Sequence, residues 1–225
     1  MTVANHLAND ISFEKWLKWV FDHPVRKPEW YWDEGDDWRE SSPATMVEFM
    51  TRLFETPAAH LLNFSDAQAN QGLWFLTGDS CLNSLVSLLD KSVPWPQRER
   101  CIHSILRLFS DYLAVRCSPH LGYIGEPGAN PLNAACYMWW DQLHTSDFGD
   151  PSNAVVNAEL LSAMSRILEL PHDACRESAL HGLGHWQWCC TEKVTAIIDS
   201  FLTNNPKLRP ELHAYALKAR TGRVL

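Results

Sequence analysis

Residues 171–188 read Pro-His-Asp-Ala-Cys-Arg-Glu-Ser-Ala-Leu-His-Gly-Leu-Gly-His-Trp-Gln-Trp, and this stretch decides how the fold is interpreted. Pro171 and Asp173 stand where a helix begins, and the Asp173 carboxylate can accept hydrogen bonds from the free N–H groups of the first turn. Apolar or small residues then recur at helical spacing: Cys175, Ala179, Leu180, Leu183 and Trp186. The stretch therefore predicts a helix with one buried face.

Two glycines interrupt this predicted helix. Gly182 and Gly184 each cost about 1 kcal/mol relative to alanine in a helix interior. We expect a second helix to pack against this face so closely that no side chain fits between the two backbones. This pattern is typical of a packed helical hairpin and not of a catalytic loop.

The run at residues 175–184 resembles the first helix of a HEAT-type repeat, and weaker copies lie near residues 65–76 and 97–109. Shifts of 78 and 110 residues align 98–105 with 176–183 and 71–73 with 181–183, which leaves room for units of about 39 residues, near the period of such repeats. A diverged middle copy is expected at 133–143. The resemblance implies an all-α fold, in which antiparallel helix pairs stack as a short right-handed α-α superhelix.

The remaining sequence is also helical in pattern, and no stretch predicts a strand. Helices are expected at residues 10–21, 43–55, 66–76, 81–91, 97–116, 132–144, 154–169, 173–188, 193–202 and 210–220. The Gly- and Pro-rich stretch 117–131 is expected to be a long loop. We expect a single domain over residues 1–225, with residues 1–40 forming a cap from one helix and an acidic aromatic loop.

Composition narrows the class of protein. The chain has 225 residues, of which 46% are hydrophobic, which is ample for a core. No run of 18 apolar residues predicts a membrane span, and residues 1–10 do not resemble a secretory signal. Seven cysteines, an odd number without a regular framework, favour a reducing, cytoplasmic environment.

The net charge of −8, from 27 acidic and 19 basic residues, disfavours nucleic-acid binding, which needs clustered Lys and Arg. The same charge suits a basic protein partner, which it would attract at long range. We therefore expect a protein partner, with no nucleic acid and no membrane. No cofactor is expected.

Residues 28–40 have the most unusual composition, with four aromatic residues and six carboxylates in thirteen positions. One interpretation is a structural loop whose aromatic rings lie against the first helices. A second is a protein-binding surface, with aromatic anchors and steering carboxylates. A calcium loop is a third, although the spacing is not that of an EF-hand. The candidate contact residues are Trp30, Tyr31, Trp32, Asp33, Asp36, Asp37 and Trp38.

The predicted helix at 173–188 also carries candidate metal ligands. His181 and His185 are four residues apart, with Cys189 four further on, a spacing that can present two imidazoles and a thiolate to zinc. A fourth ligand would come from His144 or His172. The chain has no CxxC motif, and Gly182 stands where a metalloprotease has glutamate. The alternative is that the histidines form hydrogen bonds across a packed seam.

Other catalytic patterns are weak. Cys117 and His120 flank the 117–131 loop, but nothing in their spacing orients a base, and the glycines of this loop lack the spacing of a phosphate loop. Some HEAT-like proteins are DNA glycosylases or bilin lyases, so the resemblance leaves an enzyme open. No catalytic residue is assigned.

The sequence as a whole predicts a non-catalytic, cytoplasmic, protein-binding helical-repeat protein. A more specific version of this prediction is an acidic immunity or inhibitor protein that neutralises a basic partner such as a toxin. The alternative is a metal-binding protein or HEAT-like enzyme that works through His181, His185 and Cys189.

Overall fold

The computed structural model describes residues 11–32, 42–78, 85–141 and 150–224, and this part of the chain is helical and contains no strand. The all-α class is thus confirmed. The helices are α1 (Phe13–Phe21), α2 (Pro43–Glu55), α3 (Pro57–His60), α4 (Asp66–Thr77), α5 (Trp95–Leu108), α6 (Ala114–Arg116), α7 (Leu132–Tyr137), α8 (Ala154–Leu168), α9 (Asp173–Asn204) and α10 (Pro210–Ala219).

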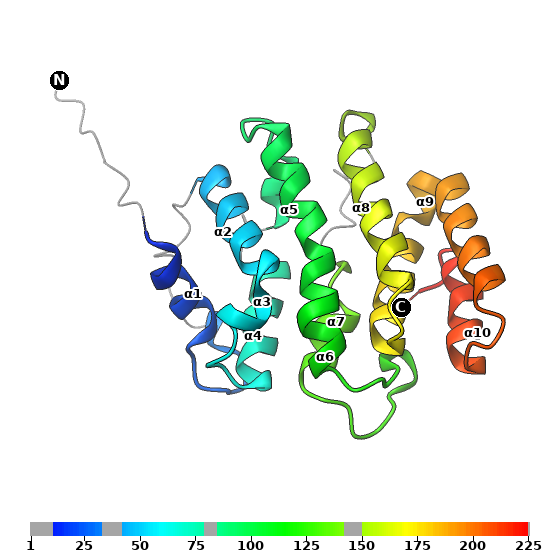
Figure 1. Cartoon of the computed structure of the whole chain (residues 1–225), viewed down its shortest axis with the longest axis horizontal. Coiled ribbons are helices and arrows are strands. Elements are labelled where there is room, and N and C mark those ends of the chain that lie inside the picture. The colour runs from blue at the N-terminus through cyan, green and yellow to red at the C-terminus, as the bar shows by residue number, and fades with distance from the viewer. Residues whose placement is uncertain (1–10, 33–41, 79–84, 142–149, 225) are drawn as a thin grey trace.

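The longer helices lie side by side in a row (Figure 1). From the N-terminal end, α2 packs on α5, α5 on α8, α8 on α9, and α9 on α10. The short helix α7 contacts both α4 and α9 and so lies between the N-terminal and C-terminal parts of the fold. This order places α9, the helix predicted from residues 171–188, between three neighbours. The HEAT-like superhelix itself stays a prediction.

Local sequence signals explain where several helices begin. Ser12, Ser42 and Ser65 each accept a hydrogen bond from a backbone N–H in the first turn of α1, α2 and α4, which satisfies a donor that has no partner inside the helix. Gln68 returns a hydrogen bond to the Ser65 backbone and completes a capping box. After α10, Gly222 adopts a φ of 70°, which is the conformation expected of a glycine that ends a helix.

Three predicted boundaries differ from the structure. The helix expected over 97–116 is α5, then a π-helical turn at Phe109–Leu113, then α6. The helix expected over 132–144 ends at Tyr137. The rings of Trp139 and Trp140, which follow, are both buried in the core. In place of the helix expected at 81–91, the described part of that range contains a short 3-10 helix, Leu85–Leu89.

A fourth difference concerns α9. The two helices expected at 173–188 and 193–202 are one element, bent at Cys190, whose φ of −131° and ψ of 36° are not helical. The intervening residues 189–192 contain neither proline nor glycine, so nothing in the sequence prevents the helix from resuming after the bend.

The packing of α9 leaves no room for a side chain at Gly182 or Gly184, as the sequence predicts, but side chains from several neighbouring segments, and not one second helix, fill that space. A Cβ atom on Gly182 would lie 2.6 Å from Cγ of Trp140 and 2.9 Å from Sδ of Met164. One on Gly184 would lie 2.5 Å from a methyl group of Val224. Other elements therefore approach α9 within the space that a side chain would need.

None of the helices that the structure describes is both long and apolar enough to cross a membrane.

The two glycines of α9 offer a matched test of this packing. Gly182→Ala should destabilise the protein, because overpacking against the rigid Trp140 ring costs about 1–3 kcal/mol and exceeds the helix-propensity gain of about 1 kcal/mol. Gly184→Ala carries the same gain but meets only the side-chain methyl groups of Val224, near the end of the chain, so it should be neutral or stabilising. Urea unfolding of both variants measures the difference; equal stabilities would contradict the close contact.

Candidate metal centre

Two histidines of α9 form the centre of a polar cluster. His181 and His185 lie one turn apart, and their Nε2 atoms are 3.1 Å from each other. The His181 side chain is 1% exposed and that of His185 is 19% exposed. The pair thus runs from the interior of the protein toward its surface.

Asp141 brings a carboxylate to the same point. Its Oδ1 lies 2.7 Å from Nε2 of His181 and 3.4 Å from Nε2 of His185. Asp141 directly follows Trp140, the ring that packs on Gly182. The absence of a side chain at Gly182 therefore lets the chain after α7 approach α9 and places Asp141 beside the histidines.

Three potential ligand atoms, one each from Asp141, His181 and His185, all lie within 4.8 Å of one another. Burial acts to raise the pKa of Asp141, but hydrogen bonds from the two histidines outweigh it and lower the pKa to about 2. Asp141 is therefore ionised at neutral pH. One oxygen and two nitrogens converge here. Without a metal, N–H groups of the histidines face the carboxylate; with a metal, their lone pairs would face the ion instead.

Tyr215 of α10 fixes the other side of the His181 ring. Its hydroxyl lies 2.6 Å from Nδ1 of His181 and 3.1 Å from the hydroxyl of Tyr137. Burial raises the pKa of Tyr215 well above its usual range, so the phenol keeps its proton. When Nδ1–H of His181 donates to Tyr215, Nε2 presents its lone pair toward Asp141. A ring held in this way is typical of a metal-binding histidine.

Cys189, predicted as the third ligand, does not belong to this cluster. Its Sγ lies 3.5 Å from the carbonyl oxygen of Trp186 and 3.8 Å from Sγ of Cys190, at the bend of α9. Eight residues after His181, an α-helix has turned about 80° away from the ligand direction. His172 lies elsewhere, with Nε2 3.1 Å from the carbonyl oxygen of Cys117, and His144 lies outside the described residues.

Asp141 is the member of this cluster that is not among the candidates expected from the sequence. The signal was present in Gly182, which predicts a close neighbour for α9. The identity of that neighbour depends on the pairing of α7 with α9, which no local pattern specifies.

The 117–131 loop, considered a site for chemistry, is held against α9. Glu177, one turn before His181, is fully buried and accepts hydrogen bonds from the backbone N–H of Gly122 at 2.7 Å and of Tyr123 at 2.9 Å. Both oxygens of this carboxylate are thus occupied by the loop. Glu177 positions the loop and offers no free oxygen to the histidines.

The structure places the candidate protein-contact residues in different surroundings. Trp30 is 1% exposed and stacks on His23 with ring centroids 3.8 Å apart, so it is a core residue and not a contact anchor. Tyr31 is half-buried, and Trp32 is 64% exposed. Asp33, Asp36, Asp37 and Trp38 lie outside the described residues.

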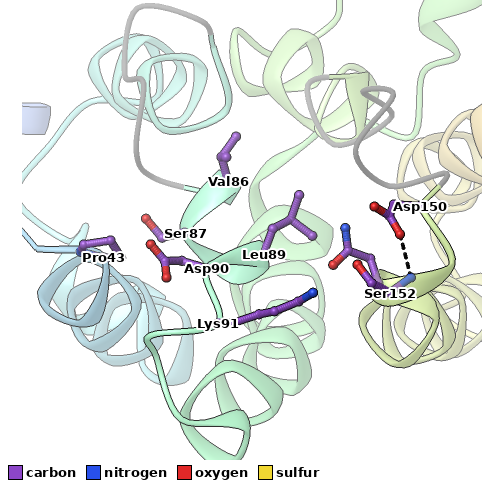
Figure 2. Close-up of a pocket in the computed structure, with 9 residues that line it drawn as sticks. Pro43, Val86, Ser87, Leu89, Asp90, Lys91, Asp150 and Ser152 are labelled. Carbon is purple, nitrogen blue, oxygen red and sulfur yellow. Dashed lines mark hydrogen bonds between the residues drawn. The ribbon is translucent and has the colours of Figure 1, made fainter.

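A surface pocket of about 360 Å³ lies between α2 and the start of α8 and is less suited to chemistry. Figure 2 shows Lys91 directed across it toward Ser152. Asp150 accepts a hydrogen bond from the Ser152 backbone at 2.7 Å, and Asp90 accepts one from the Ser92 backbone at 2.8 Å. Both carboxylates therefore stabilise local turns of the backbone.

A second group with ligand atoms within 4.8 Å consists of Glu99, His103 and Glu159. His103 is exposed, and its Nε2 lies 2.8 Å from a carboxylate oxygen of Glu159. Exposed contacts between a histidine and a carboxylate are common at protein surfaces and contribute little, so this group is a weaker candidate than the buried cluster.

Comparison with models of known families, with curated proteins and with solved structures finds no match to this chain.

The Tyr215 hydroxyl gives the first test of the cluster. Tyr215→Phe leaves Nδ1–H of the buried His181 without its partner, and should cost about 1–3 kcal/mol of stability and lower metal affinity roughly 10- to 100-fold. Tyr137→Phe keeps the bond from His181 to Tyr215 and should have a smaller effect on both. Unfolding by denaturant and calorimetric metal titration measure the two quantities. A larger loss of affinity in Tyr137→Phe would contradict the assigned role of Tyr215.

Proposed function

We propose that this protein binds one divalent transition-metal ion through Asp141, His181 and His185. The observation that carries the proposal is the convergence of three ligand atoms, from two elements distant in sequence, on one point. Two imidazoles and one carboxylate are a ligand set that suits zinc and non-haem iron. Calcium and magnesium prefer oxygen ligands.

The arrangement favours a centre that does more than stabilise the fold. Structural zinc sites are closed by four protein ligands, whereas catalytic sites use three and keep a position for water or substrate. The side chains of Asp141 and His185 are 18% and 19% exposed, so an ion held here meets solvent on that side. His181, on the opposite side, is closed off by Tyr215.

Charge supports an anionic ligand at the open position. One carboxylate and two neutral imidazoles leave a divalent ion with a net charge of about +1, which stabilises hydroxide or another bound anion. We infer that the ion activates water or binds a negatively charged group of a substrate. Asp141 and the histidines hold the ion, and Tyr215 orients His181.

Metal analysis of purified protein tests the proposal. The wild-type chain should retain one ion at this site, and His185→Gln should lose it with little change in stability because His185 is partly exposed. His103→Gln, in the Glu99–Glu159 group, is the matched control and should keep the ion. Imidazoles must be unprotonated to bind a metal, so acidification should release it. Loss of the ion in His103→Gln but not in His185→Gln would overturn the assignment.

We also propose a second role, the binding of a basic protein partner through the segment that begins at Trp32, as in an acidic immunity or inhibitor protein. What favours it is the 64% exposure of Trp32 beside the half-buried Tyr31, together with the net charge of −8. Exposed tryptophan is enriched at interfaces. The HEAT-like stacking is part of this proposal, and the sequential packing of α2, α5, α8, α9 and α10 supports it.

A capture experiment with matched tryptophan variants tests the second role. Wild-type protein should retain a basic partner from the native lysate, and salt should weaken the complex because exposed charges are screened. Trp32→Ala should lose the partner, whereas Trp188→Ala should keep it, although Trp188 is exposed to a similar degree, 61% against 64%. Equal capture by both variants would contradict the proposed binding segment.

A further inference from the structure

The Glu99–Glu159 group lies at the surface where α5 packs on α8 (Figure 1), and it shares no residue with the proposed metal centre. Glu99 and His103 are four residues apart on α5, and Glu159 comes from α8. One potential ligand atom from each of the three residues lies within 4.8 Å of the other two. The packing of two helices thus brings two carboxylates and one imidazole to one point.

Glu99 distinguishes this group from an ordinary surface contact between a histidine and a carboxylate. The Nε2 atom of His103 is 2.8 Å from an oxygen of Glu159, but Glu99 has no cationic partner within the part of the chain that the structure describes. Two carboxylates at this separation repel each other unless positive charge lies between them. The group therefore favours a bound cation.

The neighbouring arginines of α5 do not supply that charge. Nε and Nη2 of Arg100 lie 2.7 Å and 2.9 Å from the two carboxylate oxygens of Glu55. Nε of Arg107 lies 2.7 Å from Asp111. With a neutral imidazole, the Glu99–Glu159 group carries two negative charges, which a single divalent ion would neutralise.

The group also has space for the other ligands of an ion. Glu99 and His103 line a surface pocket of about 330 Å³. The side chains of His103 and Glu159 are 49% and 29% exposed. An ion held by three protein ligands keeps further positions for water, and the pocket provides room for them.

We propose that Glu99, His103 and Glu159 bind a second divalent transition-metal ion, which exchanges with solvent. Carboxylates suit manganese and an imidazole suits zinc, whereas calcium and magnesium prefer oxygen ligands alone. The bound ion ties α5 to α8. Its affinity should be lower than that of the buried centre, because exposed side chains lose more freedom when they are ordered by binding.

Zinc titration of the purified, full-length protein tests the second site. With the Asp141 centre loaded, calorimetric titration of wild type with Zn²⁺ should show one further saturable ion per chain. Glu159→Gln keeps the shape of the side chain but removes its charge, and should weaken this binding at least about tenfold, the loss that even an outer-shell partner can cause. His185→Gln should leave the binding of this ion unchanged, since His185 belongs to the other centre.

His103→Gln and His213→Gln form a matched pair, because both replace an exposed histidine. The first should abolish binding of the further ion, and the second should keep it. Zn²⁺ should also raise the thermal unfolding midpoint of wild type and His213→Gln but not that of His103→Gln, since an ion that binds only the folded chain stabilises it.

Equal zinc binding by His103→Gln and His213→Gln would overturn the proposal, and so would a wild-type chain that takes up no further zinc. Neither outcome bears on the Asp141 centre, whose ion is lost in His185→Gln and kept in His103→Gln.

Discussion

The contact between Gly182 and Trp140 is the constraint on which the rest of the structure depends. Trp140 occupies the space that a side chain at position 182 would fill, and this brings the end of α7 against α9. Asp141 comes next in the chain and thereby reaches His181 and His185. One missing side chain thus determines both the packing of two helices and the position of a carboxylate. Any larger residue at 182 forces the ring and the ligand apart together.

Burying this polar cluster has an energetic consequence. An unpaired polar group in the interior costs about 1–3 kcal/mol, so each buried atom of Asp141, His181 and Tyr215 needs a partner. Without a metal, the Tyr215 hydroxyl donates to Nδ1 of His181 and Nε2–H of His181 donates to Asp141, so both ring nitrogens are satisfied. Nε2 of His185 reaches the same point. One proton can bridge only two of these ligand atoms, whereas one divalent ion contacts all three together. This is why we favour a metal.

Features that depend only on residues adjacent in the sequence, such as the start of a helix, were predictable from the sequence. Ser42 and Ser65 mark helix starts because a hydroxyl before a helix caps it wherever the chain then goes. Gly182 predicted close packing because its cost in a helix must be offset by a contact. Asp141 and Trp30 were not predictable in the same way. The first depends on which distant helix meets α9, and the second on the burial of a ring in a segment without helical or strand periodicity.

The register of α9 connects the fold to the site. Glu177, His181 and His185 follow one another at intervals of four residues, so they form one polar line on the first half of α9, most of which is buried. Glu177 holds the loop at Gly122, and His181 holds Tyr215 and Asp141, while His185 lies nearest the surface. Rotating α9 by one residue would leave the buried Glu177 and His181 without partners, so the hydrogen bonds that stabilise the helix also fix the direction of both imidazoles. In the proposed metal centre, imidazoles held in this way would lose little freedom on binding an ion, and such preorganisation increases affinity.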